Sequence, residues 1–142
     1  MAVRDPLPFY GNTVLTFPVP SAGVALAAGG ANTYGVQSDV VITGDLVAAG
    51  FAGAVLLESV TIRTPSAGET GKVQIGHQTG AGGVVQICEV DFECATDAGW
   101  TQRSDLLGRG GLIPNGADIV ARQKTTGGAA TLTVSVGVMS PS

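Results

Sequence analysis

The sequence predicts an all-β protein: a jelly-roll-like antiparallel β-sandwich of about eight strands with an extended N-terminal arm. Three observations lead to this prediction. Several short segments alternate apolar and polar residues with a period of two, as half-buried strands do. The 22 glycines punctuate these segments with turns. No segment has the apolar spacing that predicts an amphipathic helix.

Length and composition bound the organisation of the chain. The 142 residues suffice for one domain with a core, and we divide them into an arm, residues 1–12, and a single β-sandwich domain, residues 13–142. Only 13% of the residues are charged, against about 25% in typical globular proteins. Together with a mean hydropathy of +0.35, this indicates a surface partly covered by other chains, although small Ala and Gly residues also raise the hydropathy.

The charge balance and the apolar runs argue against several classes of partner. A net charge of −4 and scattered Lys and Arg residues disfavour nucleic acid, which needs a basic footprint. The first residues lack the apolar core of a secretory signal. The longest apolar run, Leu46 to Leu57, is too short for a bilayer and contains glycines. We expect no membrane partner, and a protein that is made and kept in a cytoplasm rather than secreted.

Prolines set the arm apart from the first strand. Pro6 and Pro8 disfavour both a helix and a sheet ladder within Met1–Asn12. Phe9 and Tyr10 are apolar anchors, which we interpret as contacts to a neighbouring subunit; a frayed terminus is the alternative.

Short strands follow the arm. Leu46–Gly53 is compatible with a strand or with one helical turn, but its interspersed glycines favour irregular structure. The predicted strands are Thr13–Phe17, Gly23–Ala28, Val36–Thr43, Ala54–Thr64, Lys72–His77 and Val84–Ala95.

The last of these strands has two chemically different faces. Cys88, Val90, Phe92 and Cys94 share the face that we expect in the core, and Ile87, Glu89, Asp91 and Glu93 share the face that we expect to be exposed. The two cysteines lie about 20 Å apart along an extended strand, too far for a disulfide and too few for a zinc site. We interpret them as small buried residues.

The acidic row Glu89, Asp91 and Glu93 is open to two interpretations. Its carboxylates could contribute oxygens to a calcium site, but no calcium-loop pattern is present. They could equally pair with arginines of an adjacent strand or subunit. We favour a solvated or salt-bridged face, and we predict no metal and no cofactor.

No combination of residues predicts catalysis. His77, the single histidine, ends a strand beside a glycine loop, and no Gly-x-Ser-x-Gly motif is present to hold a nucleophile. The glycine pairs Gly29-Gly30 and Gly82-Gly83 lack the phosphate-loop pattern and open no helix. We therefore predict no catalytic residue and a protein that is not an enzyme.

The longest stretch without a pattern is Thr96–Gly116, which contains Trp100, Arg103 and Arg109. Long loops of compact domains often contact partners. Aromatic and arginine side chains anchor protein interfaces, while a tryptophan can also stack on a sugar ring or cap the core. We interpret these three residues as partner contacts, like the two aromatic residues of the arm.

The clearest alternation lies in Ala117–Met139, which we interpret as a hairpin around Gly127-Gly128. In this register Ala121 faces Val134. Leu132, Val134, Val136 and Val138 are then expected in the core. The opposite face is lightly charged and is a second candidate for contact with another subunit.

The overall pattern of the chain resembles a known class. An arm rich in Pro and aromatic residues, Arg4 to Tyr10, precedes a Gly/Ala-rich region and short strands such as Ser59-Val-Thr-Ile-Arg-Thr and Lys72-Val-Gln-Ile-Gly. The closing segment runs from Gly116-Ala-Asp-Ile-Val-Ala-Arg through Thr131-Leu-Thr-Val-Ser-Val-Gly-Val. In these features the chain resembles small all-β decoration, or cement, proteins of tailed bacteriophage heads. The resemblance implies a homotrimer that binds the major capsid protein and bridges its subunits; no site residue is carried over from the family.

These observations predict a non-enzymatic virion structural protein, a capsid decoration protein that binds and stabilises an assembled phage head as an oligomer. Two alternatives remain. One is a carbohydrate- or receptor-binding jelly roll of a phage tail or spike. The other is a main coat subunit, which would form shells unaided.

Overall fold

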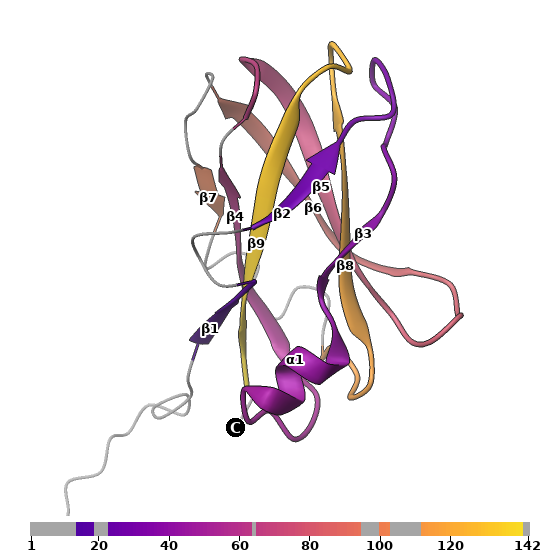
Figure 1. Ribbon diagram of the computed structural model, residues 1–142, viewed down its shortest axis with the longest axis vertical. Helices are drawn as coiled ribbons and strands as arrows, with labels where there is room; N and C mark the ends of the chain where they lie inside the picture. The colour runs from indigo at the N-terminus through magenta and orange to yellow at the C-terminus, as the bar shows by residue number, and fades with distance from the viewer. Residues whose placement is uncertain (1–13, 19–22, 64, 95–99, 103–111, 141–142) are drawn as a thin grey trace, which may run out of the picture.

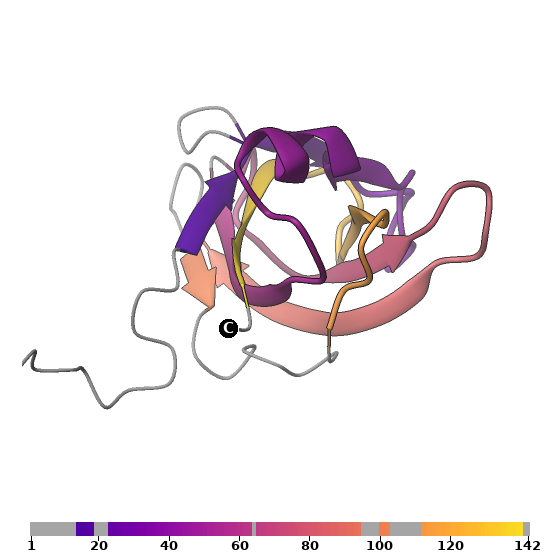
Figure 2. The same ribbon diagram turned by 90° about the horizontal axis from the view of Figure 1, so that it is seen from below.

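Two antiparallel β-sheets form a sandwich, with a short helix, α1, at one end (Figure 1). The computed structural model describes residues 14–18, 23–63, 65–94, 100–102 and 112–140. Seen along the sandwich in Figure 2, the sheets lie on either side of a common interior. The predicted fold class, a jelly-roll-like antiparallel β-sandwich, is confirmed.

The first sheet is built around β9. Its order is β1-β9-β4-β7, and β2 also pairs with β9. β1 pairs with the C-terminal half of β9 and β2 with the N-terminal half, so both lie along the same edge of that strand. The strands are β1 (Val14–Phe17), β2 (Val24–Ala27), β4 (Leu56–Arg63), β7 (Trp100–Gln102) and β9 (Thr131–Met139).

The second sheet has the order β3-β8-β5-β6. Its strands are β3 (Ser38–Val41), β5 (Glu69–Gln78), β6 (Val85–Cys94) and β8 (Asp118–Thr125). Among the described strands, only β5 and β6 are both consecutive in the chain and paired with each other. From β2 onward, all the remaining connections pass from one sheet to the other, which is the connectivity of a jelly roll.

The predicted hairpin of Ala117–Met139 is wrong as a pairing. The faces predicted to lie in the core are buried in both strands, but Val120 and Ser135 of the opposite faces are also buried, at 1% and 2% exposed. β8 pairs with β3 and β5, whereas β9 pairs with β1, β2 and β4. The two strands therefore face each other across the core instead of lying side by side. Ile119 and Val134 are both fully buried. Alternation alone cannot distinguish the two arrangements, because each turns one face of both strands inward.

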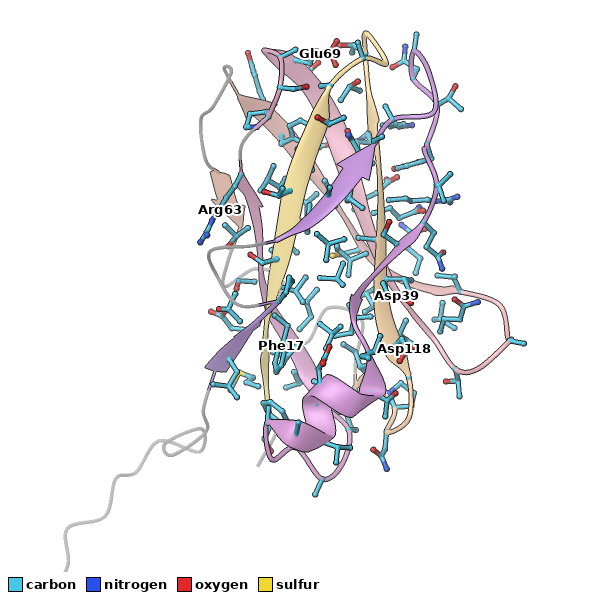
Figure 3. All side chains as sticks on the ribbon, viewed as in Figure 1. Phe17, Asp39, Arg63, Glu69 and Asp118 are labelled. Carbon is cyan, nitrogen blue, oxygen red and sulfur yellow. The ribbon has the colours of Figure 1, made fainter. Side chains whose placement is uncertain are left out.

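Residues from both sheets fill the interior. The largest side chains that are almost wholly buried include Leu26, Ile62, Ile75, Ile113, Ile119 and Leu132. Val134, Val136 and Val138 are at most 1% exposed, as predicted. At the end that carries α1, Phe17 of β1 lies near Phe51, with the ring centres 6.4 Å apart (Figure 3).

The faces of β6 agree with the prediction in all described residues but one. Cys88, Val90 and Phe92 are buried, and the acidic row is exposed. Ile87, which was expected on the acidic face, packs against the core instead. The reason is an irregularity in the β5–β6 register, where Ile75 pairs with Cys88 and Gly76 with Gln86, so that Ile87 is the extra residue of a bulge.

Helix α1 (Thr43–Ala48) overlaps the segment Leu46–Gly53. For residues 46–48 the favoured prediction of irregular structure is wrong, and the alternative of one helical turn is correct. The helix starts where the backbone N–H and hydroxyl of Thr43 donate to Asp118 Oδ1, at 2.8 and 3.1 Å (Figure 3). Leu46 is buried in the core. The hydrogen bonds to Asp118 and the burial of Leu46 both depend on distant parts of the chain, so no local sequence pattern could predict the helix.

The predicted loop Thr96–Gly116 contains a short strand, β7. It pairs with β4, with Thr61 opposite Thr101 and Ile62 opposite Trp100. A strand of three residues is too short to show an alternation, and the pairing depends on β4 rather than on its own sequence.

The connection from β8 to β9 requires glycine at position 128. Its φ of +75° lies in the left-handed region that disfavours side chains, and a Cβ there would lie 2.2 Å from the backbone of Gly30 and Ala31. Its N–H donates to Thr125 Oγ1 at 3.0 Å. The predicted turn residue is thus correct, but the turn carries the chain across the sandwich.

A buried glutamine links the two sheets. Gln123 of β8 is 0% exposed, and its Nε2 donates to the carbonyl oxygens of Leu26 and Ala130, both at 2.9 Å. Leu26 belongs to β2, and Ala130 directly precedes β9. Oε1 of Gln123 is buried without a hydrogen-bond partner, so the amide donor is the stabilising group.

We expect Gln123→Glu to destabilise the fold at neutral pH and to regain stability on acidification. The carboxylate would face two carbonyl oxygens in a buried site, which raises its pKa above the unfolded value of about 4.3. A raised folded-state pKa means that stability is retained below about pH 4.3 and lost as pH rises through the folded value. The expected cost at neutral pH is about 2–4 kcal/mol, measured against wild type by urea unfolding at each pH.

The exposed variant Gln86→Glu is the matched control and should show no such pH dependence. Equal urea midpoints for Gln123→Glu and wild type at neutral pH would show that the amide does not link the sheets.

Candidate functional site

The outer face of the second sheet collects much of the charge of the described residues. The whole chain has seven Lys or Arg and eleven Asp or Glu residues. Three basic and three acidic residues share this face of β5, β6 and β8: Lys72, Arg122, Lys124, Glu89, Asp91 and Glu93. In a chain with so few charges, this concentration marks the face as the candidate site.

Cross-strand register arranges these residues in rows. Lys72 of β5 lies opposite Lys124 of β8 and Asp91 of β6. The next outward residue of β5 is Gln74, which lies opposite Arg122 and Glu89 in the same way. Each row therefore runs from a basic residue on β8 to an acidic residue on β6.

Hydrogen bonds connect the residues within each row. Lys72 Nζ donates to Asp91 Oδ1 at 2.6 Å, and Arg122 Nε donates to Gln74 Oε1 at 2.6 Å. The hydrogen bond and the charge of Asp91 raise the pKa of Lys72. Because the two side chains of this ion pair are 40% and 80% exposed, solvent screens it. It orients the groups more than it stabilises the fold.

Tyr34, from the connection between β2 and β3, lies across this face. Its hydroxyl donates to the Glu89 carboxylate on β6. On the β8 side, the guanidinium carbon of Arg122 lies 4.7 Å and Nζ of Lys124 lies 4.9 Å from the ring centre, within cation–π range. The pKa of Tyr34 is raised, chiefly by burial and then by the hydrogen bond to Glu89 and its charge.

The backbone around Tyr34 holds the ring in place. The N–H of Gly35 donates to the Gln123 carbonyl at 2.9 Å, and the N–H of Asn32 donates to the Thr125 carbonyl at 2.8 Å. Both acceptors belong to β8, so residues 32–35 run along the edge of that strand. This pairing positions the side chain over the sheet.

Two hollows open on the face. One, of about 470 Å³, is lined by the row of Lys124, Lys72 and Asp91 together with Asn32 and Glu93. We call it the Lys72 hollow. The other, of about 200 Å³, is lined by side chains that include Gln37, Gln74, Gln86, Val84 and Arg122.

Two of the three residues of the acidic row pair with neighbours in their own chain. Asp91 forms its ion pair with Lys72, and Glu89 accepts from Tyr34. The face is salt-bridged, as predicted, but through a lysine rather than an arginine. Within the described ranges, no group of three or more His, Cys, Asp and Glu residues is placed to hold a metal ion.

The five predicted contact residues are not brought together by the described structure. Phe9, Tyr10, Arg103 and Arg109 lie outside the described residues. Trp100 is described only by its backbone, in β7. These five contacts stay predictions, as does the boundary between the arm and the domain.

Sequence reasoning missed Tyr34, Arg122 and Lys124. The alternation of β8 did place the latter two on its polar face, which was a usable signal. Tyr34 lies between the predicted strands Gly23–Ala28 and Val36–Thr43, and nothing local connects it to β6. His77, with no predicted role, is half-buried at the end of β5, opposite Ile119.

Comparisons with known proteins identify no family. No protein-family model and no curated protein matches the chain. Among solved structures, the coat protein of Tobacco streak virus aligns with 98% of this chain and 90% of its own, at 11% identity and a TM-score of 0.39. A superposition this loose carries no functional argument. Among the described helices, none has the length and apolarity to cross a membrane.

We expect Tyr34 to ionise well above the ordinary tyrosine pKa of about 10. The chain has two tyrosines, so a Tyr10→Phe variant reports Tyr34 alone by near-ultraviolet absorbance during a pH titration. Because the folded pKa is raised, the stability linked to this group is present below about pH 10 and is lost as pH rises through the folded value. Glu89→Gln should lower the pKa, since it removes the charged acceptor.

Tyr34→Phe, which leaves Tyr10 as the reporter, is the control for an ordinary tyrosine. Ionisation of Tyr34 at the same pH as that control would contradict the hydrogen bond to Glu89.

Proposed function

We propose that the chain is a non-enzymatic structural protein of a virion, a decoration protein that binds and stabilises an assembled phage head as a homotrimer. Its jelly-roll connectivity carries this proposal, because viral capsid domains frequently have this architecture. Lectins and cupins share the architecture, so fold alone supports the proposal by analogy. The low charge content and the resemblance to head decoration proteins add to it.

The distribution of exposed apolar side chains also supports an assembling protein. Ile42 and Val47, at α1, are 47% and 63% exposed, and Leu112 is 52% exposed. Leu112 precedes Ile113, which pairs with Val55 after α1, so all three lie toward the same end of the sandwich. Interface cores are depleted of charge, which favours this end over the charged outer face as the surface for another subunit.

The proposed partners are further copies of this chain and the major capsid protein, with no nucleic acid and no membrane. The chain would act in the virion after synthesis in the host cytoplasm. The predicted contacts of the arm and of the loop, Phe9, Tyr10, Trp100, Arg103 and Arg109, belong to this proposal. They would reach across to neighbouring subunits.

Stabilisation in this proposal is thermodynamic. A protein that binds only the assembled shell shifts the equilibrium away from rupture by its binding free energy. In a trimer, the first contact raises the effective concentration of the other two, to about millimolar for short connections. Weak individual contacts then suffice for stable attachment.

The oligomeric state is the first test. We expect light scattering coupled to size-exclusion chromatography to give three times the chain mass of 14.1 kDa. Val47→Glu should shift the mass toward the monomer, because it places a charge on the proposed interface. The control is Val36→Glu, since Val36 is 86% exposed and belongs to the connection between β2 and β3 rather than to α1. A strict monomer at high concentration would exclude the trimer.

Binding to capsids is the second test. We expect the full chain to co-sediment with assembled heads and a truncation lacking residues 1–12 to bind at least about tenfold more weakly, as loss of one anchoring segment predicts. A Phe9→Ala, Tyr10→Ala double variant separates the aromatic anchors from the length of the arm. Undiminished binding of the truncation would remove the arm from the mechanism. Closed particles formed by this chain alone would favour a main coat subunit instead.

A further inference from the structure

The Lys72 hollow has a side wall that the backbone fixes. Asn32 lies at the tip of a tight turn in which Gly29 N–H donates to the Thr33 carbonyl and Thr33 N–H to the Gly30 carbonyl, both at 3.0 Å. Its φ of +54° is left-handed, a conformation that asparagine tolerates better than most residues. The bond from Asn32 N–H to β8 fixes this turn beside the hollow.

Several polar groups in the hollow have no partner among the described residues. The amide of Asn32, the hydroxyl of Thr70 and the carboxylate of Glu93 make no hydrogen bond there. Together they offer acceptors and donors side by side. Lys124 adds an ammonium group whose described contact is the ring of Tyr34.

The charges of the hollow balance. Lys72 and Lys124 oppose Asp91 and Glu93, and the central pair is already joined by its ion pair. A simple anion would meet the carboxylates, and a simple cation would meet the ammonium groups. Glu93 on β6 and Lys124 on β8 are separated by two strand spacings and by two residues along the strands, which places their backbones roughly 12 Å apart. The balance favours an uncharged ligand with polar groups on opposite sides.

A sugar ring has these properties. Each hydroxyl both donates and accepts, so one ring satisfies a carboxylate, an amide and an ammonium group together. The lining residues Lys124, Thr70 and Thr126 carry an aliphatic stem and methyl groups, the kind of surface on which the C–H face of a sugar ring packs. The volume of about 470 Å³ lies within the range of about 300–1,000 Å³ that is typical of small-ligand pockets.

We propose that the Lys72 hollow binds a neutral saccharide, with Glu93, Asn32 and Lys124 as the groups that contact its hydroxyls. Lys72 and Asp91 orient one another in the centre, and Tyr34 holds Lys124 on its side of the hollow. The site is distinct from Trp100. It goes beyond the proposed function, since it uses the charged face that assembly leaves exposed to solvent.

The test is saturation-transfer NMR on the full chain with four probes: glucose, galactose, mannose and N-acetylglucosamine. We expect transfer to at least one of them, and a loss of affinity of about tenfold in Glu93→Gln, as for one hydrogen bond to a charged group. Asn32→Gly should also weaken binding while keeping the turn, because glycine accepts a positive φ. The matched control is Asp39→Asn, on the exposed face of β3, which should bind as wild type does.

Three outcomes with the sugar probes would overturn the proposal. They are no transfer to any of the four sugars, transfer that Glu93→Gln and Asn32→Gly both leave unchanged, and transfer lost in Trp100→Ala but not in Glu93→Gln. Binding of the zwitterionic peptide Gly-Gly in place of every sugar would also reject the ligand class. Glu93→Gln should still co-sediment with capsids, so a failure here is distinguishable from a failure of the proposed function.

Discussion

The fold depends on one constraint: β8 and β9 must bury their apolar faces against each other across the sandwich. Each strand is central in its own sheet, so every other strand takes its place by pairing with one of them or with a direct neighbour. Gly128 makes the crossing between them possible, and Gln123 links the sheets beside it. In a local hairpin the same side chains would lie on one face of a single layer, and they would stay exposed unless a second layer covered them.

The same constraint explains how far the sequence could be interpreted. A period of two reports which face of a strand is buried, and the core faces of β6, β8 and β9 were predicted correctly. Three residues expected on the opposite faces, Ile87, Val120 and Ser135, are also partly or fully buried. The period does not report which strand lies alongside, so the partners of β8 and β9 were predicted wrongly. Features that depend on contacts from distant segments left no local pattern. Helix α1, held by Asp118, and the bulge at Ile87 are examples.

The candidate site was partly predictable for a related reason. Alternation placed the acidic row on an exposed face, and the structure confirms that placement. The partners of the acidic row come from other segments. β5 and β8 supply the basic residues Lys72, Arg122 and Lys124, and Tyr34 belongs to the segment on the far side of β8. Such a site is assembled by sheet order, and sheet order follows from the crossing of the sandwich rather than from any one segment.

Charge segregation connects the site with the proposed assembly. Charged residues are costly in the core of an interface unless each is paired, whereas a face that stays in water tolerates them. A chain with 13% charged residues that places three basic and three acidic residues on one sheet face leaves other surfaces free for apolar contact. The exposed Ile42 and Val47 at α1 lie on such a surface. The proposed assembly through the α1 end and the proposed saccharide site on the outer face of the second sheet use different surfaces, so the two proposals do not compete and one small domain can accommodate both.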